Sequence, residues 1–262
     1  LCASVVGIYV KGLPTVLHIV LCMSAAMIGA AMWAFIPVIL KIKVNTHEVV
    51  TALMLNYVAT LLVDFATNYP MRDPDASTAQ SMMLESSAQL PKLFARSQVT
   101  IAIIIGIVIA VLLGAFLRHT TMGYKIALVG GNSSAAAAAG INQNRIMIFT
   151  MLISGACGGL AGAALVMGTY GRLIQGFSTG YGFDGIAVAV LGTSPLVAVL
   201  CAFLFGALRA GGTALSYGTN LSVQFISALQ GIIILLMAAP ALTRNIFWGK
   251  NVYRFKDRRK RV

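Results

Sequence analysis

Apolar runs of about bilayer length alternate with short polar stretches along most of the chain. A transmembrane helix takes roughly 20 mostly apolar residues. Residues 1–10 are too few to cross, and we expect them to be the tail of a truncated span. The predicted fold class is all-α: a polytopic membrane helix bundle of about seven full spans plus the truncated N-terminal one. The clearest full spans are 16–40, 49–65, 99–117, 145–167, 196–211 and 222–241.

The stretch Thr169–Gly185 breaks the apolar pattern with glycines, tyrosines and Arg172. Irregular backbone at membrane depth is tolerated only inside protein or beside water, so a broken or re-entrant helix is predicted here. Helix ends expose free backbone groups, and such breaks often form transporter substrate sites. Asp184 is interpreted either as the cap of a following helix, 185–192, or as a substrate contact. Arg209, near the outer end of span 196–211, needs an acid or a cavity, and Asp184 is a possible partner.

A second polar stretch, Met122–Ile148, predicts a short surface helix between two spans. Asn132 or Ser133 is a suitable N-cap, Ala135–Ala139 favour helix, and Gly140 is suited to end it. From the residues alone, this short helix is either an ordinary loop helix or a docking site for a soluble partner. The helix residues are Ser133, Ser134, Ala135, Ala136, Ala137, Ala138, Ala139 and Gly140.

Charge sets the orientation. The chain is 58% hydrophobic and 10% charged, with mean hydropathy +0.87 and net charge +12, and the positive-inside rule places its basic clusters in the cytoplasm. The predicted organisation is a transmembrane domain, 1–242, with an outer loop at 68–98 and a cytoplasmic loop at 118–146. A basic cytoplasmic tail, 243–262, touches anionic lipid. Nucleic acid is not an expected partner.

Polar residues inside the spans are candidates for packing or for a pathway. Asn56, near mid-membrane, predicts either an interhelical hydrogen bond or a pathway contact. Gln224, Ser227 and Gln230 share one helix face, with the same two interpretations open. The segment Gly130–Ser134 lacks the lysine of a phosphate-binding loop, and no metal-ligand or nucleophile motif is present. The chain is therefore not expected to be an enzyme, to bind a metal or to carry a cofactor.

Three stretches resemble a known family: GYKIALVGGNSSAAAAAGINQNRI with MLISGACGGLAGAAL, NTHEVVTALMLNYVA, and GFDGIAVAVLG with FGALRAGG. They are similar to the permeases of ATP-driven importers of the branched-chain amino acid, ribose and nucleoside group, most of all the nucleoside branch. In that family the cytoplasmic loop carries a coupling helix that docks on the ATP-hydrolysing subunit. Here five alanines, Ala135–Ala139, stand where charged residues are common, so salt bridges to that subunit are not expected there.

The resemblance implies a bacterial inner-membrane, multi-pass subunit with a cytoplasmic C-terminus, importing a guanosine-like nucleoside. Its implied partners are an ATP-binding subunit that holds the ATP and magnesium, a second permease that is a different chain, and an extracytoplasmic binding protein. A ribose or other sugar permease is the close alternative, and a secondary transporter the more distant one. A nucleoside path suits aromatic and amide groups. The candidate path residues are Asn56, Tyr57, Phe177, Tyr181, Phe183, Asp184, Arg209, Gln224 and Gln230.

Overall fold

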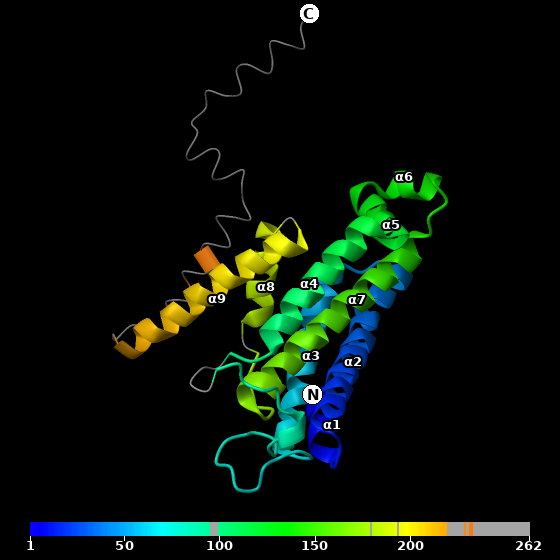
Figure 1. Cartoon of the computed structure of the whole chain (residues 1–262). Coiled ribbons are helices and arrows are strands. Elements are labelled where there is room, and N and C mark those ends of the chain that lie inside the picture. The colour runs from blue at the N-terminus through cyan, green and yellow to red at the C-terminus, as the bar shows by residue number, and fades with distance from the viewer. Residues whose placement is uncertain (95–98, 179, 193, 219–227, 229–230, 233–262) are drawn as a thin grey trace, which may run out of the picture. The chain divides into compact units, whose positions relative to one another are not determined.

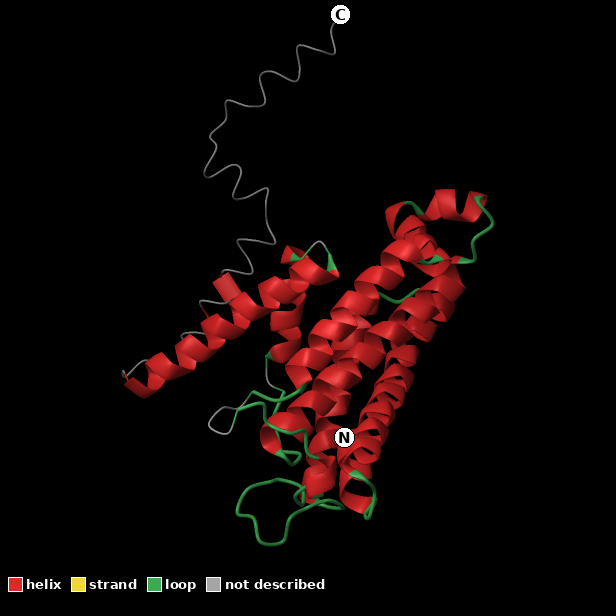
Figure 2. Cartoon of the chain, viewed as in Figure 1, coloured by secondary structure: helices red, strands yellow, loops and turns green. Residues whose placement is uncertain are grey.

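The computed structural model describes residues 1–94, 99–178, 180–192, 194–218, 228 and 231–232. It divides into two compact units, Leu1–Thr179 and Gly180–Val262, and each is described by itself. The predicted last span, 222–241, and the basic tail lie almost entirely outside the described residues, as do Gln224 and Gln230. Helices joined by loops make up the described chain, whose only strand-like pairings are isolated bridges (Figure 2).

Long helices form the first unit (Figure 1). Four of them are apolar and long enough to cross a membrane, and the α4 helix has no buried residue at all. The predicted spans are confirmed as helices, each shifted by a few residues at its ends. The bounds are α1 Cys2–Tyr9, α2 Thr15–Val44, α3 Glu48–Asn68, α4 Ala102–His119, α5 Thr121–Gly131, α6 Ser133–Ala138 and α7 Gln143–Ala164, with the 3-10 turn η1 at Ser86–Ala88.

The closest helix pair of the unit is α2 with α7, and glycine makes the contact possible. A Cβ added at Gly155 would lie 2.7 Å from the Ala30 carbonyl oxygen, and one added at Gly159 would overlap the Ala26 carbonyl. Real Cβ atoms do not approach so closely, so the backbones of α2 and α7 touch because these side chains are absent. Since Gly155 meets Ala30 and Gly159 meets Ala26, the two helices run antiparallel.

The predicted break after α7 is present in the structure. The α7 helix widens into one π-helical stretch, η2 (Leu165–Tyr170), and ends at Gly171, whose φ is +64°. Non-helical backbone follows, with a second positive φ at Gly176. The positive φ values explain why glycine stands at these turns, since residues with a side chain rarely adopt them.

The second unit contains α8 (Tyr181–Leu191) and α9 (Pro195–Gly218). The α9 helix is a fifth helix able to cross a membrane by length and composition, whereas α8 is apolar but too short. Two predictions are wrong here. The helix after the break begins at Tyr181 rather than at 185, and α9 continues to Gly218, beyond the end predicted at residue 211.

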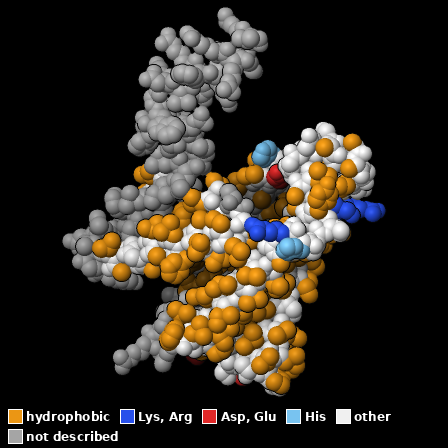
Figure 3. Space-filling view, turned by 45° about the horizontal axis from the view of Figure 1, so that its top comes forward, with side chains coloured by type: hydrophobic (Ala, Val, Ile, Leu, Met, Phe, Trp, Pro, Cys, Tyr) orange, Lys and Arg blue, Asp and Glu red, His pale blue; other side chains and the backbone are white. Residues whose placement is uncertain are grey.

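Side chains on the described surface match a membrane setting. Large hydrophobic residues such as Val16, Leu61, Leu112 and Phe203 are exposed on the long helices, and one side of the molecule is largely covered by such side chains (Figure 3). A soluble protein rarely exposes apolar area on this scale. The chain is therefore a multi-pass membrane protein, of whose roughly seven predicted spans the described residues contain five.

Candidate functional site

The loop between α4 and α7 folds into two short helices at one end of the first unit, opposite the loop between α3 and α4 (Figure 1). Thr120 caps α5, because its hydroxyl accepts a hydrogen bond from Gly123 N at 3.0 Å. Asn132 caps α6 in the same way, accepting from Ala135 N at 3.1 Å. Of the two predicted caps, Asn132 is therefore the one used.

Gly140 ends α6 as predicted. Its φ is +73°, its N–H donates to the Ala137 carbonyl, and the N–H of Ile141 donates to the Ala136 carbonyl. This paired arrangement at a left-handed glycine is a common helix stop. The Gln143 amide also donates to the Ser133 carbonyl at 2.5 Å, which ties the start of α6 to the start of α7.

The α6 helix presents one bare face. Ala136 is fully buried, whereas Ser133, Ser134, Ala135, Ala137, Ala138, Ala139 and Gly140 are exposed. Because the exposed positions carry only methyl groups, hydroxyls or no side chain, a partner can approach the helix backbone closely. The structure thus contains the short, capped helix that the sequence predicts, and its docking role stays a prediction.

In the second unit, Arg209 of α9 is held by two groups from α8. Its guanidinium lies 2.5 Å from an Asp184 carboxylate oxygen, and its Cζ lies 4.1 Å from the centre of the Tyr181 ring. Both charged side chains are about a quarter to a third exposed. The predicted partnership of Asp184 and Arg209 is confirmed, and the aromatic contact adds a cation–π interaction that the sequence did not reveal.

Asp184 is not the cap of α8. Gly180, with φ +86°, precedes the first helical residue, so Asp184 sits inside the first turn, where its negative charge favours the helix N-terminus. The capping residue directly precedes the first helical residue. Because α8 begins at Tyr181, this position is occupied by Gly180 and not by Asp184. The nearest atoms to a Cβ at Gly180 belong to Arg209, at 3.7 and 3.8 Å, so the arginine lies against the turn itself.

The remaining described candidates are Asn56, Tyr57, Phe177 and Phe183. Asn56 and Tyr57 are exposed on α3, and Phe177 lies edge-on to Tyr170 with ring centres 6.3 Å apart. Phe183 is 59% exposed on α8. Among the described candidates of the second unit, Tyr181, Asp184 and Arg209 form a cluster around the arginine.

The loop after α3 is bound to the break after α7, and sequence reasoning missed this contact. Ser81 N donates to the Leu173 carbonyl at 2.8 Å, while Leu173 N donates to the Ser81 hydroxyl at 2.9 Å. Gln175 N donates to the Ala79 carbonyl, and Arg172 lies 3.7 Å from Asp73. The break is thus shaped by main-chain pairing with a segment about 90 residues earlier.

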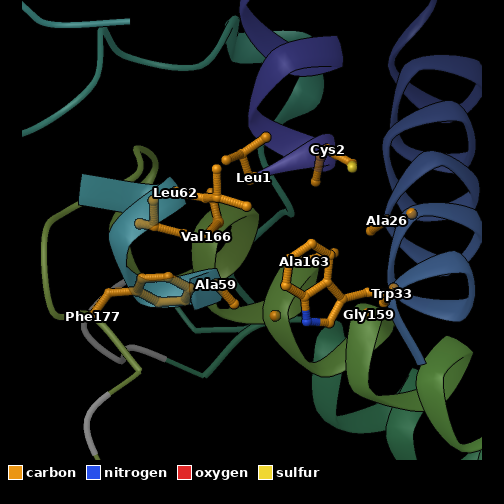
Figure 4. Close-up of a pocket in the computed structure, with 15 residues that line it drawn as sticks. Leu1, Cys2, Ala26, Trp33, Ala59, Leu62, Gly159, Ala163, Val166 and Phe177 are labelled. Atoms are coloured by element: carbon orange, nitrogen blue, oxygen red, sulfur yellow. The ribbon is translucent and has the colours of Figure 1, made fainter. Parts of the chain in front are cut away.

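An apolar cavity of about 290 Å³ opens between α1, α2, α3 and α7 (Figure 4). Apart from the Trp33 indole and the Cys2 thiol, its lining side chains carry only carbon atoms. The lining consists of Leu1, Cys2, Ala3, Ala26, Gly29, Ala30, Trp33, Ala59, Leu62, Val63, Gly159, Gly162, Ala163, Val166 and Phe177. A polar solute would find few hydrogen-bonding groups here, so this cavity is a poor candidate for the path of a hydrophilic substrate.

Comparison with known proteins decides the family. Residues 1–238 match the family described as branched-chain amino acid transport system / permease component. The chain belongs to this family. The chain is therefore a permease component of a transport system, which is not itself an enzyme.

Several individual members of the family are similar to this chain over most of its length. The chain is 33% identical over 238 residues to the guanosine ABC transporter permease protein NupP of Bacillus subtilis, covering 88% of this chain and 68% of the relative. It is 30% identical to the glucose ABC transporter permease protein TsgB13 of Haloferax volcanii (86% and 62%) and to the nucleoside ABC transporter permease protein NupB of Lactococcus lactis (86% and 65%). The chain thus spans about two thirds of the length of these relatives. No solved structure matches it.

Proposed function

We propose that the chain is the membrane-spanning permease subunit of an ATP-driven importer that carries a guanosine-like nucleoside across the bacterial inner membrane. The observation that carries this proposal is the 33% identity to a guanosine permease over 238 residues. A second nucleoside permease at 30% identity supports it. The glucose permease at the same identity makes a simple sugar the alternative cargo.

In this proposal α6 receives the motion of a separate ATP-binding subunit, which holds the ATP and magnesium. The support is geometric. The helix is capped at its start by Asn132, stopped at Gly140 and exposed along Ala137–Ala139. Because α6 lies between α5 and α7, a push on it would act on both of these helices. A second permease subunit and an extracytoplasmic binding protein complete the proposed importer.

The test is ATP-dependent uptake in proteoliposomes that hold the full complex. Labelled guanosine and labelled glucose are offered to the wild type, to Ala137→Glu and to the matched control Ala137→Ser. A carboxylate buried without a partner at a docking face costs enough to lower the affinity roughly tenfold or more. We expect guanosine uptake by the wild type and by Ala137→Ser, with uptake at least tenfold lower for Ala137→Glu.

Each other outcome has a definite meaning. Glucose uptake without guanosine uptake would keep the importer and replace its cargo. Uptake that needs no ATP would contradict the importer mechanism and favour a secondary transporter. Normal uptake by Ala137→Glu would leave the cargo in place but remove the coupling role of α6.

A further inference from the structure

The α3 helix carries a line of polar side chains through a membrane span. Asn56, Thr60 and Asp64 lie four residues apart, so they share one side of the helix. We name these three residues the α3 polar line. Asn56 and Thr60 are exposed and Asp64 is half-buried, on a helix that is otherwise apolar enough to span the bilayer.

Within the described part of the chain, the side chains of the α3 polar line make almost no contacts that would stabilise the fold. The Thr60 hydroxyl donates to the Asn56 carbonyl at 3.0 Å, as threonine commonly does inside a helix. Neither the Asn56 amide nor the Asp64 carboxylate has a hydrogen bond or ion pair with another described residue. The interhelical bond considered for Asn56 is therefore not formed among them.

Asp64 is the most telling member of the line. Its Oδ1 atom is buried and has no hydrogen-bond partner among the described residues. Its main-chain carbonyl, by contrast, accepts from both the Thr67 hydroxyl and the Asn68 amide. A buried carboxylate oxygen without a donor is costly, so its presence calls for an explanation. A partner from outside the chain is one such explanation.

Lipid cannot be the neighbour of this line. An amide and a carboxylate facing hydrocarbon each cost several kcal/mol, and polar residues in spans therefore face a bundle interior or a watery cavity. The partner must also offer hydrogen-bond donors, because an ionised carboxylate only accepts. Sugar hydroxyls meet this requirement. An acidic side chain that accepts from ribose hydroxyls is a recurrent mode of nucleotide recognition.

We propose that Asp64 accepts hydrogen bonds from the vicinal 2′- and 3′-hydroxyls of a nucleoside at the loop end of α3, and that Asn56 contacts the same solute deeper along the helix. This inference rests on the proposed nucleoside import. It makes the polar line a selectivity element of the permease itself, additional to whatever selection a binding protein makes beforehand.

The test compares guanosine with 2′,3′-dideoxyguanosine in the complete complex, in wild type and in Asp64→Asn, with the same binding protein throughout. Selection by the binding protein cancels in the ratio between the two permeases. A hydrogen bond to a charged group typically changes affinity about tenfold or more. We expect Asp64→Asn to raise the apparent KM for guanosine about tenfold and to leave dideoxyguanosine uptake unchanged.

Two further variants sharpen the result. Asp64→Glu keeps the carboxylate one methylene further out and should retain part of the preference for guanosine. Asp75→Asn is the matched control, since it removes an exposed carboxylate in the loop after α3, and it should behave as wild type. Assembly of every complex is checked by size-exclusion chromatography.

A uniform loss for both substrates in Asp64→Asn would overturn the inference, because it would make Asp64 a structural residue or a contact to another subunit. Unchanged guanosine uptake in Asp64→Asn would overturn it equally. Failure of the wild type to carry any nucleoside would refute the proposed function instead, and this outcome is seen before any variant is compared.

Discussion

Single glycines decide how closely the two most tightly packed helices approach. Gly155 and Gly159 of α7 face the α2 backbone, whereas Gly158 has nothing within 4 Å of the position of a Cβ. The same helix thus carries both a closely packed and an open glycine, one residue apart. This difference separates the effect of packing from the effect of helix propensity.

We expect Gly159→Ala to lower the stability of the protein by about 1–3 kcal/mol, the usual cost of forcing an extra carbon into a packed contact. Gly158→Ala should be neutral or stabilising by up to about 1 kcal/mol, because alanine is the better helix former. The measurement is the thermal unfolding midpoint of the detergent-solubilised complex. Equal shifts for the two variants would refute the close contact between α2 and α7.

For single residues, the sequence predicted that a charged side chain needs a partner better than it predicted the exact geometry of its contacts. The pairing of Asp184 with Arg209 was anticipated because a membrane arginine needs an acid. The predicted position of Asp184 relative to its helix was wrong. Several glycines lie close together here, and the sequence does not show that Gly180 is one that adopts a positive φ. The cation–π contact with Tyr181 depends on a ring orientation that no spacing reveals.

Among the elements, the most consequential pairing joins the loop after α3 to the break after α7. Ser81 is fully buried and bonds Leu173 through both its main chain and its hydroxyl. Leu173 is also fully buried, so its N–H has no water as a substitute acceptor. The loop therefore holds the break in shape, and a change at Ser81 acts on a segment far away in the sequence.

We expect Ser81→Ala to cost about 1–3 kcal/mol, because the buried N–H of Leu173 loses its acceptor. The break should then open more readily, and protease added to right-side-out vesicles should cut residues 171–180 faster than in wild type. Ser77→Ala, an exposed serine of the same loop, is the control and should leave the rate unchanged. Equal rates for Ser81→Ala and wild type would show that the pairing does not hold the break.

Element prediction succeeded where composition dominates and failed where distant segments meet. Apolar runs of bilayer length located every long helix of the first unit, and the asparagine, alanine and glycine pattern located α6. The α5 helix was missed, since its three glycines and single lysine suggest a loop. The extension of α9 through 212–218 was missed for the same reason, as glycine and serine are poor helix formers whose preference the surrounding helix overrides.

For the molecule in its membrane, the decisive property is the unequal charge of the two ends of the first unit. The end with α5 and α6 carries Lys41, Lys43, Arg118, Lys125 and Arg145 against the single acid Glu48, which pairs with Lys41 at 2.9 Å. The opposite end carries Asp73, Asp75 and Glu85 against Lys11, Arg72, Lys92 and Arg172 among the described residues, so its positive excess is smaller. From this charge difference the positive-inside rule predicts that α6 lies on the cytoplasmic side, where the proposed ATP-binding subunit would dock.

This orientation predicts opposite accessibility for two exposed positions. In a background without the four native cysteines, Thr78→Cys should react with a membrane-impermeant maleimide on intact cells, because it lies in the loop after α3. Ala138→Cys on α6 should react only after permeabilisation, in cells that lack the ATP-binding subunit and so leave the helix uncovered. Returning that subunit should slow the reaction at Ala138 and not at Thr78. Labelling of Ala138 on intact cells would reverse the orientation, and since ATP is hydrolysed inside the cell, it would also remove α6 as the site where the importer is driven.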